Sequence, residues 1–445
     1  MLPEILPRPA SITNDEYQAR RRALMAALPA DSAVLLPGAS LVTRSRDSEF
    51  PFRQDSDFHY LTGFPEPDAL LVLLPGRPEG ESVLFCQDRN PLMEAWTGIR
   101  LGAEGAVREH AVDQAFENAE RDERLEAMLD GRRTLYLPLD SPEAMALAEE
   151  VRSALTARVR HGASPPAALA DVAPLLHEAR LIKSEAELSL LRHAAQISAR
   201  AHVRAMRAAR PGLAEYHLQA ELEHEFHWQG GSGPAYASIV GGGANACVLH
   251  YIENRAPLRD GDLVLIDAGA EFDLYAGDIT RTFPVNGRFS EAQRALYALV
   301  LGVQERAVAA IAPGVTLAEL HEGVVRGLTE GLIGLGLLEG EVQARIDDES
   351  YRRFYLHSTS HWLGLDVHDV GGYRQAGEPR PLAPGMVLTV EPGLYIPADD
   401  DIPAAFRGIG IRIEDDVAVT ASGHEVLTAG VPKGIDEIEA LMAQE

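Results

Sequence analysis

The sequence predicts an α/β (α+β) protein with two domains, a smaller N-terminal α/β domain at residues 1–178 and a C-terminal domain at residues 179–445. The length of 445 residues exceeds the roughly 250–300 residues at which a single hydrophobic core stops growing. Short apolar runs alternate with helical patterns in the first part of the chain. A helix, Pro-Gly, helix pattern occurs twice in the second part. We therefore expect two separate cores and an internal duplication.

Composition limits the classes of partner. Hydrophobic residues make up 46% of the chain, as in ordinary globular proteins. The 40 basic and 67 acidic residues give a formal charge of −27, which repels phosphate backbones and anionic membranes. We therefore expect neither a nucleic acid nor a membrane as a partner.

Two features bear on the compartment. Cys86 and Cys247 are the only cysteines and have no C-x-x-C spacing, so the sequence predicts no disulfide framework. The apolar stretch 23–28 after three arginines is too short and begins too late for a signal peptide, and it favours an amphipathic surface helix. The predicted location is the cytoplasm.

The N-terminal domain is expected to alternate strands and helices. Apolar runs at 33–36, 70–74, 82–85 and 134–137 predict buried strands. Residues 142–157 follow a helical pattern. A Pro- and Ala-rich passage at 162–166 then leads to the domain boundary.

The C-terminal domain begins with a capping box, Ser184 with Glu187, which predicts a helix as far as residue 210. Pro211-Gly212 ends it, and a second helix follows at 213–228. The same order recurs with capping boxes at Ser290 and Thr316, separated by Pro313-Gly314. This repeat predicts an internal duplication with a pseudo-two-fold relation.

Four carboxylates and one histidine occupy strand-like settings in this domain. They are Asp267, Asp278, His361, Glu391 and Glu414. A lone acid of this kind is usually a strand-end or turn residue, but burying several is costly unless they are paired or bind metal. Oxygen ligands with one imidazole and no thiolate suit hard or borderline divalent ions. Because four negative charges balance two divalent cations, the set predicts a two-metal hydrolytic site.

Other catalytic motifs are absent from the sequence. Residues 224–228 approach the H-E-x-x-H zinc motif but carry Trp228 at the second histidine position. There is no G-x-S-x-G motif, and neither cysteine has a cationic context. Three histidines, His357, His361 and His368, do lie close together in sequence, with His250 as a further candidate.

Six segments of the C-terminal domain resemble the aminopeptidase P family (Xaa-Pro aminopeptidases) of metal-dependent "pita-bread" peptidases. They are residues 250–251, 265–269, 275–283, 360–364, 390–395 and 408–415. The N-terminal domain is similar to that of the same family through residues 53–63 and the region of Trp96. The resemblance implies a pita-bread C-terminal fold with two metals, most often Mn²⁺, with Co²⁺ or Zn²⁺ as alternatives.

The resemblance also assigns roles. Asp267 would chelate one metal, Asp278 and Glu414 would bridge both, and His361 with Glu391 would complete the other. Glu391 would carry a proton to the leaving nitrogen, with the catalytic histidines being His250, His361 and His368. The substrate-binding residues would be Tyr395, Arg412, His357 and Trp96.

The implied substrates are peptides with proline at the second position, and the implied state is a homo-oligomer, a dimer or tetramer, in which Trp96 reaches a neighbouring subunit. Either Arg374 or Arg380 could contact the substrate. A prolidase that cleaves Xaa-Pro dipeptides is the alternative activity. A non-catalytic pita-bread binding protein and a metal-free member acting on a small guanidino compound are disfavoured, since all five ligands are present.

Overall fold

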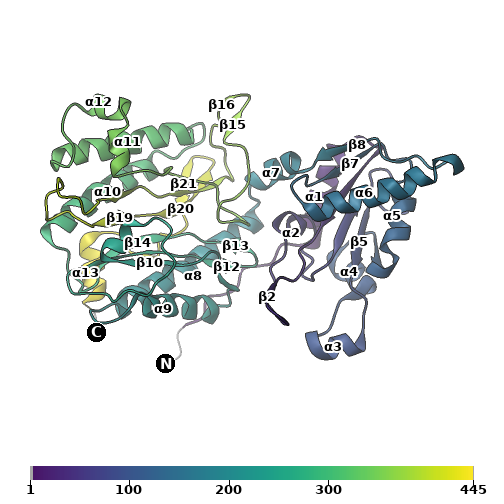
Figure 1. The fold of residues 1–445 in the computed structure, drawn as a ribbon, viewed down its shortest axis with the longest axis horizontal. Helices are drawn as coiled ribbons and strands as arrows, with labels where there is room; N and C mark the ends of the chain where they lie inside the picture. Colours follow the sequence, from purple (N-terminus) through teal and green to yellow (C-terminus); the bar gives the residue numbers. More distant parts are fainter. Residues whose placement is uncertain (1–3, 444–445) are drawn as a thin grey trace. The chain divides into compact units, whose positions relative to one another are not determined.

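The computed structural model describes residues 4–443, and this part of the chain forms two compact units. One comprises residues 11–180, and the other comprises residues 181–443 with residues 4–10 (Figure 1). The boundary predicted after residue 178 falls within the helix α7 (Ala173–Leu181). Between residues 4 and 443, no helix is both long and apolar enough to cross a membrane.

The N-terminal unit contains a six-stranded sheet in the order β6-β5-β4-β1-β7-β8. The strands are β1 (Ser32–Pro37), β4 (Leu70–Leu73), β5 (Ser82–Cys86), β6 (Gln114–Glu117), β7 (Thr134–Leu137) and β8 (Ala168–Asp171). β1 pairs antiparallel with β4 and parallel with β7. The four predicted strands are β1, β4, β5 and β7, whereas β6 and β8 are less buried and lack the apolar runs that sequence patterns detect.

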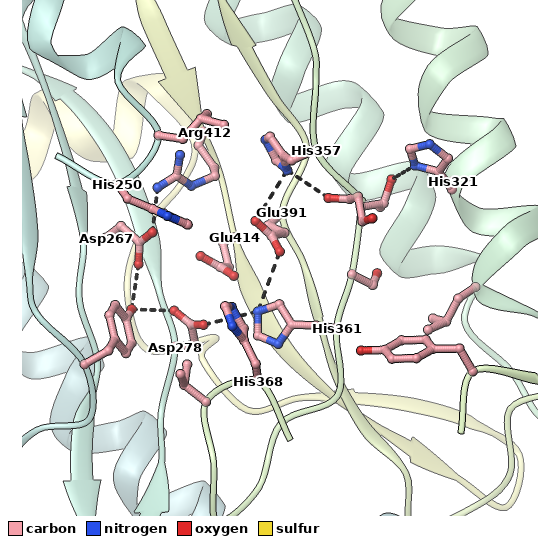
Figure 2. A pocket seen from close by; sticks show the side chains of 18 of the residues that line it. His250, Asp267, Asp278, His321, His357, His361, His368, Glu391, Arg412 and Glu414 are labelled. Carbon is pink, nitrogen blue, oxygen red and sulfur yellow. Dashed lines mark hydrogen bonds and ion pairs between the residues drawn. The ribbon is translucent and has the colours of Figure 1, made fainter. Parts of the chain in front are cut away.

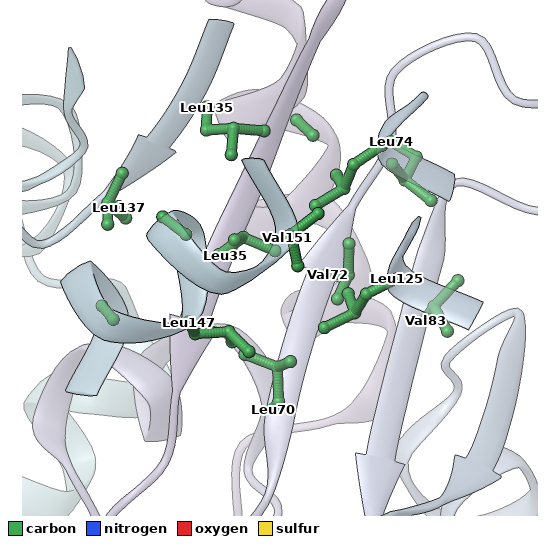
Figure 3. Close-up of a cluster of buried hydrophobic side chains, with 14 of the residues drawn as sticks. Leu35, Leu70, Val72, Leu74, Val83, Leu125, Leu135, Leu137, Leu147 and Val151 are labelled. Atoms are coloured by element: carbon green, nitrogen blue, oxygen red, sulfur yellow. The ribbon is translucent and has the colours of Figure 1, made fainter. Parts of the chain in front are cut away.

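The helices of this unit are α1 (Asn14–Ala26), α2 (Ser56–Thr62), α3 (Pro91–Thr97), α4 (Gly102–His110), α5 (Arg121–Leu129), α6 (Pro142–Ala157) and α7, and a short hairpin pairs β2 (Thr43–Ser45) with β3 (Ser48–Glu49). α5 and α6 contribute side chains to the core of the sheet, whereas α3 buries none of its residues. Leu35 of β1, Leu125 of α5 and Leu147 of α6 belong to one buried cluster (Figure 3). Removing this apolar surface from water is the main force that holds the helices on the sheet.

The C-terminal unit repeats a pair of long helices. The helices are α8 (Glu185–Ala208), α9 (Glu215–Trp228), α10 (Glu291–Ala309) and α11 (Leu317–Gly334), with the shorter α12 (Val342–Asp347) and α13 (Ile435–Met442). The predicted capping boxes at Ser184, Ser290 and Thr316 are all formed. In Figure 1, α8 and α9 lie on one side of the strands of this unit and α10 and α11 on the other.

Each half also contributes a three-stranded antiparallel sheet, in the orders β10-β11-β14 and β17-β20-β21. Their strands are β10 (Ile239–Gly242), β11 (Leu263–Asp267), β14 (Thr280–Pro284), β17 (Val387–Val390), β20 (Asp415–Thr420) and β21 (Gly423–Val426). The shorter strands are β9 (Gly233–Pro234), β12 (Ala270–Phe272), β13 (Tyr275–Ala276), β15 (Arg374–Gln375), β16 (Glu378–Pro379), β18 (Gly393–Tyr395) and β19 (Gly410–Arg412). Two helix pairs and two matching sheets are the internal duplication expected from the repeated pattern.

The predicted hairpin around Asp267 and Asp278 is only partly formed as expected. β11 and β14 do pair antiparallel, and Asp267 lies opposite Thr280. The residues between them form β12 and β13, which pair in a separate sheet with β9. The connection between β11 and β14 therefore passes through a second sheet. Asp267 and Asp278 lie at the two points where the chain leaves the first sheet and returns to it.

Candidate active site

The four acids converge because each one follows or precedes a buried strand. Asp267 ends β11 and Asp278 precedes β14, while Glu391 follows β17 and Glu414 lies between β19 and β20. Figure 2 shows all four carboxylates pointing toward one another from the two halves of the unit. Asp278 and Glu414 are 4% and 2% exposed, so these charges are removed from water.

Neutral and cationic groups hold the carboxylates in place. The phenol of Tyr236 lies 2.6 Å from Asp267 Oδ1 and also contacts Oδ1 of Asp278. Arg412 donates from Nη2 to Asp267 Oδ2 at 2.5 Å. The Thr280 hydroxyl donates to Glu414 Oε2 at 2.6 Å. These contacts fix the orientation of three acids without neutralising most of their charge.

His361 presents one nitrogen to the acids. Its Nδ1 donates to the carbonyl of Trp362 at 2.9 Å, which directs Nε2 toward Asp278 Oδ2 at 3.5 Å and Glu391 Oε1 at 3.6 Å. A carbonyl bonded to one ring nitrogen is the usual way to orient the other as a metal ligand. Ligand atoms of Asp278, His361 and Glu414 all lie within 4.8 Å of one another.

The electrostatics of the cluster favour a positive charge among the acids. Burial, followed by the neighbouring carboxylates, raises the pKa of Glu414 and of Asp278. Burial likewise raises the pKa of Glu391 to about 7. Burial opposes ionisation of His361, yet its hydrogen bond to Asp278 and the charge of Glu391 raise its pKa to about 9. The residues thus fit bound divalent cations, which would replace these protons.

A second set of contacts links the candidate substrate residues. His357 Nδ1 donates to the carbonyl of Ser358, so its Nε2 accepts from the Tyr395 hydroxyl at 2.8 Å. The same hydroxyl accepts from Arg412 Nη1 at 2.9 Å. Burial and the charge of Arg412 lower the pKa of His357 to about 4. His357 is therefore a neutral imidazole, one contact away from the arginine that holds Asp267.

The cluster lines a cavity of about 980 Å³, a volume typical of small-molecule sites. His250, His357, His361 and His368 line it, and the rings of His361 and His368 lie 4.4 Å apart. Arg374 lines the cavity as well, and its Nη1 donates to the Gly377 carbonyl at 2.8 Å. The backbone N–H of Arg380 donates to the Tyr373 carbonyl. Trp96 lies on α3 of the N-terminal unit and is 87% exposed.

Three further residues of the site were not singled out as functional from the sequence. Tyr236 lies in an irregular segment after β9, where no periodic pattern marks it. His321, in the first turns of α11, lines the cavity and contacts Thr359 Oγ1 at 2.8 Å through Nδ1. The backbone carbonyl of Thr359 accepts from the N–H of Glu391. Only the pairing of distant segments brings these residues to the acids.

Comparison with known proteins defines the class. Residues 189–421 match metallopeptidase family M24, and residues 17–136 match the aminopeptidase P N-terminal domain. The chain belongs to metallopeptidase family M24, and the predicted α/β architecture with a C-terminal pita-bread domain is confirmed.

The similarity extends over nearly the whole chain. The Xaa-Pro aminopeptidase of Escherichia coli is 48% identical over 97% of this chain and 98% of that protein. The structure of Pseudomonas aeruginosa aminopeptidase PepP superposes with a TM-score of 0.96 at 52% identity, covering 97% of this chain and 98% of that one. Zinc-substituted E. coli aminopeptidase P in complex with product gives a TM-score of 0.95 at 48% identity, covering 97% and 99%. The resemblance to aminopeptidase P is confirmed.

Proposed function

We propose that this chain is a metal-dependent aminopeptidase that hydrolyses the N-terminal Xaa-Pro peptide bond. The observation that carries the proposal is the cluster of Asp278, His361, Glu391 and Glu414, which lines a ligand-sized cavity. It occurs in a chain of family M24 whose full-length relatives are named Xaa-Pro aminopeptidases.

The proposed metal ligands are those expected from the sequence. Asp267 would bind one ion, Asp278 and Glu414 would bind both, and His361 with Glu391 would bind the other. When bound, such ions acidify water and stabilise the negative charge that develops on the scissile carbonyl. Mn²⁺ is the proposed ion, with Co²⁺ and Zn²⁺ as alternatives.

The protein's own residues would orient the peptide and move the proton. The backbone N–H of Glu391 donates to the Thr359 carbonyl and fixes the chain at this point. Its carboxylate accepts from the Thr389 hydroxyl at 3.5 Å and lines the cavity, so it can deliver a proton to the leaving proline nitrogen. His250 and His368 can donate to the oxygen of the scissile carbonyl. His357 and Tyr395 would bind substrate and, through Arg412, support the position of Asp267.

The cavity lining suits a proline-containing peptide. It includes apolar Leu249, Ile252 and Val367, which suit a proline ring and its neighbours. Arg374 also lines the cavity, so it is the better candidate than Arg380 for a contact with the carboxylate end of a peptide.

Three peptides separate the candidate activities. With Mn²⁺ present, the protein is expected to cleave Arg-Pro-Pro and to leave Arg-Ala-Pro intact, since only the first has proline in second position. Turnover of an Xaa-Pro dipeptide with no turnover of Arg-Pro-Pro would replace the proposal by a prolidase. Equal turnover of both tripeptides would remove the proline preference.

We also propose a homo-oligomer, either a dimer or a tetramer. Leu92, Trp96 and Ile99 on or next to α3 are 79%, 87% and 83% exposed, an apolar patch of the kind that marks an interface. Light scattering after gel filtration should show loss of the oligomer in Trp96→Ser and not in Tyr216→Ser, which removes an exposed aromatic ring elsewhere. A monomeric wild type would contradict the proposal.

Location in the cytoplasm stays a prediction.

A further inference from the structure

Glu215, the first residue of α9, is fully buried, and its carboxylate accepts four hydrogen bonds from outside that helix. Oε1 accepts from the backbone N–H of Gly242 at 2.8 Å and from Asn245 Nδ2 at 2.9 Å. Oε2 accepts from the Tyr251 hydroxyl at 2.9 Å and from the backbone N–H of Ala256 at 2.8 Å. Two carboxylate oxygens provide about four acceptor sites, so all of them are used.

The four donors belong to one segment, residues 242–256, which begins with a 3₁₀ turn at Gly243–Cys247 and which we name the His250 loop. Gly242 ends β10 and Ala256 lies at the far end of the loop, so one side chain joins both ends. The loop carries Leu249, His250 and Ile252, which line the cavity. It contributes no proposed metal ligand, because those residues lie at or after β11.

The position of Glu215 at the start of a helix favours its negative charge, but it does not account for these contacts. A capping role would use the N–H groups of α9 itself, whereas all four donors lie 27 to 41 residues further along the chain. Burial of a carboxylate is costly unless it is fully hydrogen bonded, and the four hydrogen bonds to Glu215 form only in this conformation of the loop. The buried carboxylate therefore stabilises this conformation of the loop relative to others.

Apart from Glu215, the loop is held near its far end by the buried Asn254, which donates to Gln219 Oε1 and to the Ser238 carbonyl and accepts from the Val240 N–H. The outer side of the loop is exposed. Val248 and Ile252 are 54% and 58% exposed, and His250 is exposed as well. On its inner side, Leu249 and Tyr251 pack against a small cluster that contains Leu265 and Tyr395. Tyr251 thus contacts both Glu215 and the wall of the site, directly next to His250 in the chain.

We propose that Glu215 is a positioning residue for substrate binding, which holds the His250 loop so that His250 faces the peptide. This inference rests on the proposed function, in which His250 contacts the substrate. Glu215 touches neither the substrate nor the acids, and it acts only through the loop.

The test replaces one oxygen of the carboxylate. Glu215→Gln keeps the size of the side chain but presents an NH₂ group to two of the four donors. With Mn²⁺ and Arg-Pro-Pro, kcat/KM is expected to fall about tenfold or more, with a higher KM and a lower kcat, because His250 both binds the peptide and donates to its scissile carbonyl oxygen. Hydrogen–deuterium exchange should become faster across residues 242–256 and remain unchanged across 263–284, and bound metal should be unchanged.

A double-mutant cycle separates positioning from a general loss of stability. If Glu215 acts through His250, Glu215→Gln should have less than about a twofold effect on kcat/KM in a His250→Ala background. Glu439→Gln is the matched control, because Glu439 is also a buried acid that accepts from a backbone N–H and two arginines, away from the cavity. It should leave kcat/KM and the exchange of the loop unchanged.

Defined results would overturn the inference. These are an unchanged kcat/KM and unchanged exchange in Glu215→Gln, or an equal loss of kcat/KM with and without His250. Tyr251→Phe removes a single donor and should give a smaller change in the same direction, so it serves if Glu215→Gln does not fold. If the wild type fails to cleave Arg-Pro-Pro, the proposed function fails, and the exchange experiment still tests the loop.

Discussion

Tyr236 lies 2.6 Å from Asp267 through its hydroxyl, and the same oxygen contacts Asp278. One phenol therefore orients two carboxylates, Asp267 and Asp278, which lie at opposite ends of the connection between β11 and β14. Burial, followed by the charges of Asp267 and Asp278, raises the pKa of Tyr236, so its proton is kept for these carboxylates. The site consequently depends on a residue that is not itself a proposed ligand.

Replacing Tyr236 by phenylalanine should weaken metal binding. Groups that orient metal ligands typically change metal affinity or activity by about 10–100-fold when removed. Titration of the metal-free variant with Mn²⁺, followed by calorimetry, should show a loss in this range with unchanged circular dichroism. Tyr216→Phe, on the exposed surface of α9, is the control. Wild-type affinity in Tyr236→Phe would show that the phenol does not orient the ligands.

Replacing Glu391 by glutamine should remove turnover while the fold persists. Loss of a general acid–base group typically costs about 10²–10⁴-fold in rate, and Glu391 is also a proposed ligand. Single-turnover cleavage of Arg-Pro-Pro measures the loss. Glu378→Gln, in the exposed strand β16, should retain the wild-type rate. Substantial turnover by Glu391→Gln would exclude it as the proton carrier.

Removing metal should abolish activity and lower stability. Burial, and after it the charges of neighbouring acids, raises the pKa of Glu414 and of Asp278, so bound cations should favour their ionised forms. Ions that bind only the folded state stabilise it by about 2.7 kcal/mol at a concentration 100 times Kd. Dialysis against chelator, then thermal unfolding with and without Mn²⁺, should show an increase in Tm and return of activity. Full activity without added metal would contradict the two-metal proposal.

The N-terminal unit contains an ion pair whose contribution should depend on pH. His177 Nε2 lies 3.3 Å from Asp57 Oδ2, and this hydrogen bond raises the pKa of His177. A raised folded-state pKa means that the stabilisation is fully present below the unfolded value of about 6.5 and is lost as pH rises through the folded value.

His177→Gln should therefore lower Tm more at pH 6 than at pH 9 relative to wild type. Differential scanning calorimetry at the two pH values gives the comparison. His161→Gln, in an exposed turn, should show no such difference. An equal decrease at both pH values would indicate that packing, not charge, is what His177 contributes.

Local patterns allowed much of the fold to be predicted. The capping boxes at Ser184, Ser290 and Thr316 depend on residues three apart, so their signal is complete within one turn. β6 and β8 escaped prediction because their half-buried sides show no apolar run. β12 and β13, between Asp267 and Asp278, also escaped prediction, because β12 pairs with β9, which lies more than 30 residues earlier in the chain.

The sequence by itself determined which residue types form the site. Acids at the ends of buried apolar strands need a hydrogen-bonding group, an opposite charge or a metal as a partner. The sequence also determined the duplicated helices, whose signals are local. Only the tertiary structure decided how those acids are held. Tyr236 and Arg412 reach Asp267, and Glu215 reaches the His250 loop, through pairings between distant segments. No local pattern encodes such contacts, since they join residues far apart in the chain, and Arg412 meets Asp267 only when both halves of the unit pack together.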